Sequence, residues 1–278
     1  ISLARIFAVA NQKGGVGKTT TCVNLAASLA ATRKKVLMVD LDPQGNATMG
    51  SGVDKYDLHV SIYDVLVHET PVLDVRRSGT EAGFDVLPAN GDLTAAEVEL
   101  LHTEHKERRL ADALSHVAED YDYILIDCPP SLNMLTLNGL VAADSVLIPM
   151  QCEYYALEGL SALANTIQQV AETVNPRLEI EGLLRTMYDP RNSLTNDVSA
   201  QLQSHFGDRV YRTVIPRNVR LAEAPSFGLP VIQYDPKSRG AKAYLALAGE
   251  IIRRQVDNED NGPDDDVTAA VDAAGPEQ

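Results

Sequence analysis

The decapeptide NQKGGVGKTT, residues 11–20, follows a short apolar segment and is the strongest local indication of how this chain folds. Its glycines at positions 14, 15 and 17 permit backbone dihedrals that other residues rarely adopt, so successive N–H groups can turn toward one anion. A helix that begins at Lys18 points the positive end of its dipole at the same anion. The pattern predicts a phosphate-binding loop made by Gly14, Gly15, Val16, Gly17, Lys18, Thr19 and Thr20.

This loop carries two lysines rather than one. Lys18 occupies the position from which a lysine reaches the β- and γ-phosphates of a nucleotide, and the Thr19 hydroxyl can ligate Mg²⁺. The strict pattern has glycine where this chain has Gln12, so the loop is a variant. Lys13 can reach a phosphate held by a partner subunit and neutralise charge during hydrolysis, as an arginine finger does. The alternative is that Lys13 is an ordinary solvated lysine.

Apolar runs recur along the chain at the spacing of an α/β protein. The predicted strands are Ile6–Ala10, Val36–Asp40, Phe84–Leu87, Tyr123–Asp127, Ser145–Pro149, Ile180–Met187 and Val210–Val214. The predicted helices are Lys18–Ala31, Leu93–Leu101, Arg108–Ala118, Met134–Ala142, Leu157–Thr173, Asp197–Phe206 and Gly240–Arg254. Strands without polar alternation are typical of a sheet covered on both faces, so we expect one doubly wound, mainly parallel α/β domain. Ligands of such sheets bind beyond the carboxyl ends of the strands.

Two carboxylates follow predicted strands and belong to the same edge. In VLMVDLDPQGNAT (residues 36–48), Asp42 comes just after the strand and can orient an attacking water or reach Mg²⁺ through water. The simpler interpretation is that Asp42 caps the turn before Pro43. In YDYILIDCPPS (residues 121–131), Asp127 ends an apolar strand and is the expected second acid for Mg²⁺, unless it is only a buried, hydrogen-bonded carboxylate.

The composition sets limits on the class of protein. The 278 residues contain 45% hydrophobic and 5% aromatic residues, no Trp, and no apolar run long enough to span a membrane. The net charge of −15 is uneven, because residues 257–278 contain eight acidic side chains and no Lys or Arg. We therefore expect an ATPase-type domain over residues 1–256 and an acidic, disordered tail over 257–278. The three cysteines show no ligand spacing and are expected to be reduced, buried thiols of a cytoplasmic protein.

Five segments together resemble the deviant-Walker ATPases, and more narrowly the ParA/Soj chromosome- and plasmid-partitioning family. They are KGGVGKTTT at 13–21, DLDPQGNAT at 40–48, DCPPSL at 127–132, PMQCEYYALEGL at 149–160 and VIPRNVRLAEAPSFGLP at 214–230. The resemblance implies an ATP- and Mg²⁺-dependent homodimer in which Lys13 crosses to the partner's nucleotide and Asp42 supports hydrolysis. It further implies that Pro216 and Asn218 line the adenine, with Met187 beneath the base, and that the chain is the short form without a helix-turn-helix domain.

The resemblance also implies nonspecific binding to double-stranded DNA and stimulation by a ParB/Spo0J-type partner, hence a nucleoid-associated protein. The basic residues expected to contact DNA are Arg191, Arg217, Arg220, Lys237, Arg239 and Lys242. Such binding depends on phosphate contacts and weakens steeply with salt. The alternative is that these are ordinary solvated side chains.

Other function classes share parts of this pattern. A MinD-like, membrane-associated division ATPase has the same loop but ends in a basic amphipathic helix, whereas this sequence ends in acidic residues, so we expect no membrane binding. A nitrogenase-reductase-like electron carrier requires paired cysteines, and Cys128 has no second cysteine in such a pattern. A scaffold that binds nucleotide without turnover is the third alternative.

Overall fold

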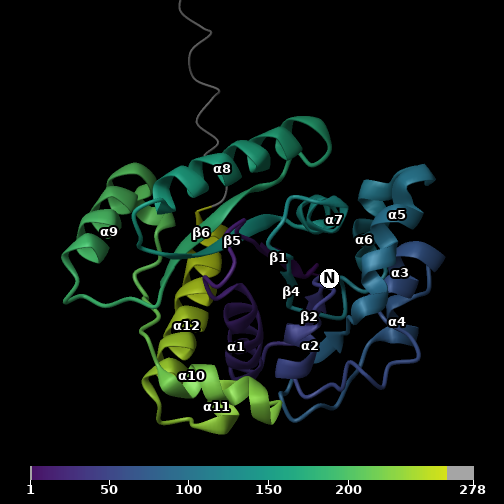
Figure 1. Cartoon of the computed structure of the whole chain (residues 1–278), viewed down its shortest axis with the longest axis horizontal. Coiled ribbons are helices and arrows are strands. Elements are labelled where there is room, and N and C mark those ends of the chain that lie inside the picture. Colours follow the sequence, from purple (N-terminus) through teal and green to yellow (C-terminus); the bar gives the residue numbers. More distant parts are fainter. Residues whose placement is uncertain (1, 262–278) are drawn as a thin grey trace, which may run out of the picture.

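A six-stranded, all-parallel sheet forms the centre of the computed structural model, which describes residues 2–261 (Figure 1). Its order is β3-β2-β4-β1-β5-β6. The strands are β1 (Arg5–Val9), β2 (Val36–Asp40), β3 (Asp85–Leu87), β4 (Tyr123–Asp127), β5 (Ser145–Gln151) and β6 (Glu179–Thr186). Because β1 lies between β4 and β5, the loops that follow these three strands meet at one edge of the sheet.

Helices cover both faces of this sheet. They are α1 (Lys18–Ala31), α2 (Asn46–Gly50), α3 (Ile62–His68), α4 (Val72–Val75), α5 (Ala96–Glu99), α6 (Arg109–Ser115), α7 (Met134–Ala142), α8 (Ala156–Thr173), α9 (Ser193–Phe206), α10 (Val219–Glu223), α11 (Val231–Tyr234) and α12 (Arg239–Asp260). In Figure 1, α1, α10, α11 and α12 lie together on one side, and α7 and α8 lie on the other. No helix among residues 2–261 is long and apolar enough to cross a membrane.

The core divides into two apolar clusters, one on each face of the sheet. Phe7 and Val9 of β1 pack in the cluster that includes α1 and α12, whereas Ala8 packs in the opposite cluster with α6, α7 and α8. Successive side chains of a strand point to opposite faces, so a strand covered on both sides must be apolar throughout. This explains the runs without alternation and confirms the doubly wound α/β fold.

The predicted strand Val210–Val214 is wrong. Only Val210 pairs with the sheet, through an isolated parallel bridge to Leu183 of β6. Side chains replace the missing ladder: the Glu250 carboxylate accepts from the N–H groups of residues 212 and 213, each at 2.9 Å. The Arg185 guanidinium donates to the carbonyl of residue 211 at 2.8 Å. A backbone satisfied in this way needs no neighbouring strand.

Several predicted boundaries also differ from the structure. The segment predicted as helix Leu93–Leu101 is broken, with α5 flanked by 3₁₀ turns. Helix α9 begins at Ser193 rather than Asp197, because the Asn192 side chain caps it by accepting from the N–H groups of residues 194 and 195. Helix α12 runs to Asp260, so residues 257–260 of the predicted tail are helical, and residues 262–278 lie outside the described residues.

Candidate active site

The 11–20 loop connects β1 to α1 at the carboxyl edge of the sheet, where loops from both neighbouring strands contact it. The Asn11 side chain donates to the Pro149 carbonyl of β5 at 2.8 Å. Just before the loop, the N–H of Cys128 donates to the carbonyl of Val9, the last residue of β1, at 3.1 Å. From the sheet edge, the Thr186 hydroxyl donates to the Val16 carbonyl at 2.7 Å. The loop itself is thus anchored by β5 and β6, while β4 pairs with the strand that leads into it.

Two glycines, not three, give this loop its shape. Gly15 and Gly17 have φ of +72° and +88°, whereas Gly14 lies outside the left-handed region, which corrects the expectation that all three need glycine's freedom. A Cβ atom on Gly14 or Gly15 would meet no described atom within 4 Å, so the space over the loop is open. Gly17 caps α1 without a side-chain hydrogen bond, and the first turn holds no acidic residue. The free N–H groups there suit an anion.

Lys18 lies folded over the loop. Its Nζ donates to the Lys13 carbonyl at 2.8 Å, and the residue is only 8% exposed. Burial lowers the pKa of Lys18, while Asp127 and Asp42 oppose this effect by attracting the charged form. The ammonium therefore lies against the loop and within the electrostatic influence of both predicted carboxylates.

Asp127 is buried at the end of β4 beside Thr19. The Thr19 hydroxyl donates to its Oδ2 at 2.8 Å, whereas its Oδ1 has no hydrogen-bond partner among the described residues. Burial and the neighbouring Asp40 carboxylate raise the pKa of Asp127 well above its usual range. A nearby cation would relieve both effects.

The residues present fit Mg²⁺ only as part of a nucleotide complex. In residues 2–261, no three His, Cys, Asp or Glu side chains converge to form a cage for a metal ion. Mg²⁺ commonly takes one or two protein oxygens and completes its shell with phosphate oxygens and water. The Thr19 hydroxyl and the unpartnered Asp127 oxygen are donors of that kind.

Asp40 supports the site, although sequence analysis assigned it no role. Its two oxygens accept from the N–H of Asp42 at 3.0 Å and from the N–H and hydroxyl of Thr48 at 2.9 and 2.7 Å. Burial raises its pKa to about 6, although these hydrogen bonds oppose the shift. Asp40 thereby fixes the turn that carries Asp42. The signal available in the sequence was its place directly after four apolar strand residues.

Asp42 caps its turn and also faces the site. Its Oδ1 accepts from the N–H of Gln44 at 3.0 Å, which is the simpler role considered above. Asp42 is half-buried, and its carboxylate helps to raise the pKa of Asp127. The two roles are compatible, because its Oδ2 makes no hydrogen bond to the residues that the structure describes.

Lys13 pairs with Glu153, which follows β5. The two side chains form an ion pair and are 57% and 40% exposed. Sequence analysis did not single out Glu153. The only indication in the sequence was that Glu153 lies in PMQCEYYALEGL (149–160), one of the segments that carry the family resemblance.

The residues predicted to line a base lie at the end of β6. Met187 is half-buried with φ of +48°, and the next residue, Tyr188, donates its N–H to the Ile215 carbonyl at 2.9 Å. Tyr188 also forms an isolated bridge with Pro216. Asn218 caps α10 by accepting from the N–H of residue 221 at 3.3 Å. The structure thus places Met187 next to Tyr188, the residue that pairs with Pro216.

The predicted DNA-contacting residues fall into two groups. Arg191 pairs with Asp189 at 3.0 Å, and Arg220 pairs with Glu223 at 2.9 Å and Asp235 at 3.2 Å. The others are exposed and form no ion pair with any residue in 2–261: Arg217, Lys237, Arg239 and Lys242.

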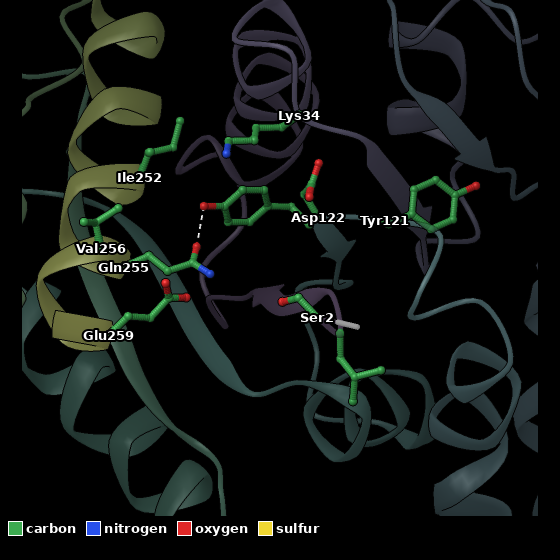
Figure 2. A pocket seen from close by; sticks show the side chains of 10 residues that line it. Ser2, Lys34, Tyr121, Asp122, Ile252, Gln255, Val256 and Glu259 are labelled. Atoms are coloured by element: carbon green, nitrogen blue, oxygen red, sulfur yellow. Dashed lines mark hydrogen bonds between the residues drawn. The ribbon is translucent and has the colours of Figure 1, made fainter. Parts of the chain in front are cut away.

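A hollow of about 200 Å³ lies at the opposite edge of the sheet (Figure 2). Tyr121, Lys34 and residues of α12 line it, and Gln255 accepts the hydrogen bond drawn there from the Tyr123 hydroxyl. Tyr123 begins β4, whereas Asp127 ends it. The hollow is therefore separate from the loop site.

Comparisons with known proteins place this chain in a family. A family model described as an AAA domain matches residues 4–180. The sporulation initiation inhibitor protein Soj of Bacillus subtilis is 55% identical over 249 residues, covering 90% of this chain and 98% of Soj. The chromosome partitioning protein ParA of Caulobacter vibrioides is 52% identical over 257 residues, covering 92% and 96%.

A solved structure shows the same fold with ligands. Cobyrinic acid a,c-diamide synthase from Mycobacterium smegmatis, with a bound ATP analogue and magnesium, superposes with a TM-score of 0.80 at 39% identity. The match covers 91% of this chain and 96% of the other.

Proposed function

This chain belongs to the ParA/Soj family of chromosome-partitioning ATPases, and from that premise we propose that it is a Mg²⁺-dependent ATPase whose ATP-bound dimer holds DNA. One observation carries the proposal. The start of α1 without a side-chain cap, the buried Lys18 and an Asp127 oxygen that has no partner among residues 2–261 all lie at the 11–20 loop, where Lys18 contacts the Lys13 carbonyl and Asp127 the Thr19 hydroxyl. Together they supply N–H donors, an ammonium and an acid to one triphosphate.

The phosphates lie on residues 14–20, and Lys18 exchanges the Lys13 carbonyl for their oxygens. Thr19 and Asp127 would hold Mg²⁺, with Asp42 reaching it through water, and the ion would supply positive charge to the phosphates. The base lies against Met187, Pro216 and Asn218.

Hydrolysis requires a positioned water and additional positive charge. Asp42 has one oxygen held by its own turn, and the other, which has no hydrogen bond to any residue in 2–261, can accept a proton or a hydrogen bond from water. Lys13 supplies its ammonium to the nucleotide of a partner subunit, for which it must first leave Glu153. Asp42 and Lys18 act within one subunit, whereas Lys13 acts across the dimer.

DNA binding is the output of this cycle. Arg217, Lys237, Arg239 and Lys242 are exposed for phosphate contacts, whereas Arg191 and Arg220 must exchange carboxylate partners for phosphates. Dimerisation doubles the number of such contacts. This raises the affinity for DNA without any contact that depends on the base sequence. A ParB/Spo0J-type protein stimulates hydrolysis and release, so the protein is cytoplasmic and nucleoid-associated.

Two assays with ATP and Mg²⁺ test the proposal in wild type, Lys13→Gln and Asp42→Ala. One measures retention of double-stranded DNA, and the other measures dimer formation by sedimentation. We expect Asp42→Ala to accumulate as a DNA-bound dimer without releasing phosphate, and Lys13→Gln to stay monomeric and unbound. Lys35→Gln, which removes an exposed lysine at the opposite edge of the sheet, is the control. Wild-type phosphate release by Asp42→Ala, or a DNA-bound dimer of Lys13→Gln, would contradict the assigned roles.

A further inference from the structure

Arg185 is a buried arginine whose side chain contacts neutral groups in the described part of the chain. It is 6% exposed, near the end of β6, and pairs with no carboxylate among residues 2–261. Its Nη1 donates to the Ser199 hydroxyl of α9 at 2.9 Å, and its Nη2 donates to the Tyr211 carbonyl at 2.8 Å. Its guanidinium also lies 5.5 Å from the centre of the Tyr188 ring. An unpaired buried charge costs stability, and these neutral acceptors offset part of that cost, although the buried Nε has no hydrogen-bond partner among residues 2–261.

Arg185 and Thr186 divide their contacts between the two faces of β6. Successive side chains of a strand point to opposite faces. Thr186 donates to the Val16 carbonyl of the phosphate loop at 2.7 Å, whereas Arg185 holds the segment 211–212. The end of β6 therefore contacts both the phosphate loop and the segment 211–212.

That segment leads directly to the residues assigned to the base. The Ile215 N–H donates to the Arg185 carbonyl at 2.9 Å, and Tyr188 then pairs with residues 215 and 216. Because 211–214 is not a strand, it has no continuous ladder to hold it. The Arg185 side chain supplies main-chain hydrogen bonds that a ladder would otherwise make.

We propose that Arg185 is a positioning residue for the nucleotide base, an inference that rests on the proposed ATP site. Its guanidinium holds the 211–216 segment on β6 and so places Pro216 and Asn218, while Thr186 supports the phosphate loop independently. Without the guanidinium, the carbonyls of residues 211 and 212 lose their donor. The segment then keeps only the bonds of its N–H groups to Glu250 and to the main chain of β6, and we expect it to sample other conformations. Base binding must then order it again, at a cost in affinity.

Calorimetry can compare the binding of Mg²⁺–ATP with the binding of Mg²⁺–tripolyphosphate. The difference separates the contribution of the base and ribose from that of the phosphates. We expect Arg185→Met to raise the Kd for ATP about tenfold, the equivalent of one lost charge-assisted hydrogen bond, with tripolyphosphate binding within about twofold of wild type. Ser199→Ala, which removes one acceptor and leaves Arg185 in place, should raise the Kd for ATP about threefold. Arg185→Lys, which keeps the charge without the fork, should resemble Arg185→Met.

Arg5→Met is the matched control, because Arg5 contacts β6 through Glu181 at 2.8 Å, far from Thr186 along the strand. It should leave both dissociation constants unchanged. A ratio of ATP to tripolyphosphate affinity that is the same in Arg185→Met as in wild type would overturn the positioning role, even if both affinities fall. If Arg185→Met does not fold, the same comparison is made with Ser199→Ala and Arg185→Lys, and an unchanged ratio in both variants overturns the role. Failure of the wild type to bind ATP would instead overturn the proposed function.

Discussion

Replacing Asp127 with asparagine should stabilise the nucleotide-free protein while abolishing ATP hydrolysis. The carboxylate is buried, one of its oxygens has no partner among residues 2–261, and Asp40 is its register partner on β2. Both carboxylates therefore belong to one buried patch of negative charge. Asparagine is nearly the same size and can still accept the hydrogen bond from the Thr19 hydroxyl.

The magnitude follows from the strand spacing. Neighbouring strands lie about 4.8 Å apart, so two carboxylates about 5 Å apart repel by about 3 kcal/mol at an effective dielectric of about 20. The weaker hydrogen bond from Thr19 and the lost attraction of Lys18 offset about 1 kcal/mol of this gain. We expect Asp127→Asn to raise the free energy of unfolding by about 2 kcal/mol at pH 8.

The gain should depend on pH in a defined direction. The folded-state pKa of Asp127 is raised above its unfolded value, so the folded state binds the proton more tightly. Wild-type stability is then greatest below the unfolded pKa and falls as pH rises through the folded pKa. The advantage of Asp127→Asn should therefore be smaller at pH 5 than at pH 8.

Urea unfolding followed by circular dichroism measures both effects. Asp120→Asn, at an exposed position, is the control for the change in net charge. A nonhydrolysable ATP analogue with Mg²⁺ at 100 times the Kd should add about 2.7 kcal/mol to wild type and less to the variant. An Asp127→Asn protein that is no more stable than wild type at pH 8, or whose advantage does not shrink at pH 5, would refute this reasoning.

Two further predictions concern the loop. Gly17→Ala should cost about 1–2 kcal/mol of unfolding free energy and abolish ATP binding, because its φ is +88°, whereas Gly14→Ala should change stability by less than about 0.5 kcal/mol. Urea titration checks both, and equal losses would contradict the assignment of backbone strain. Glu153→Gln should release Lys13 and lower the protein concentration for half-dimerisation with an ATP analogue by about two- to fivefold, the worth of an exposed ion pair. Sedimentation measures this against Glu158→Gln, and an unchanged midpoint would show that the pair does not restrain Lys13.

Local pattern in the chain was sufficient for the phosphate loop, α1, the six strands and the position of Asp127 at a strand end. These features depend on neighbours a few residues apart: glycine spacing, apolar runs and the start of a helix. The same features also predicted at which edge of the sheet the site lies, because the carboxyl ends of parallel strands share one edge.

Pairings between distant residues were decided only by the tertiary structure. Val210–Val214 is apolar enough for a strand, but Arg185 and Glu250 satisfy its backbone from other elements. Likewise, the unpartnered oxygen of Asp127 and the ion pair of Lys13 with Glu153 depend on which loops meet at the sheet edge. The physical reason is that a hydrogen bond or a desolvated charge is set by its neighbours in space, and for these residues those neighbours lie many positions away along the chain.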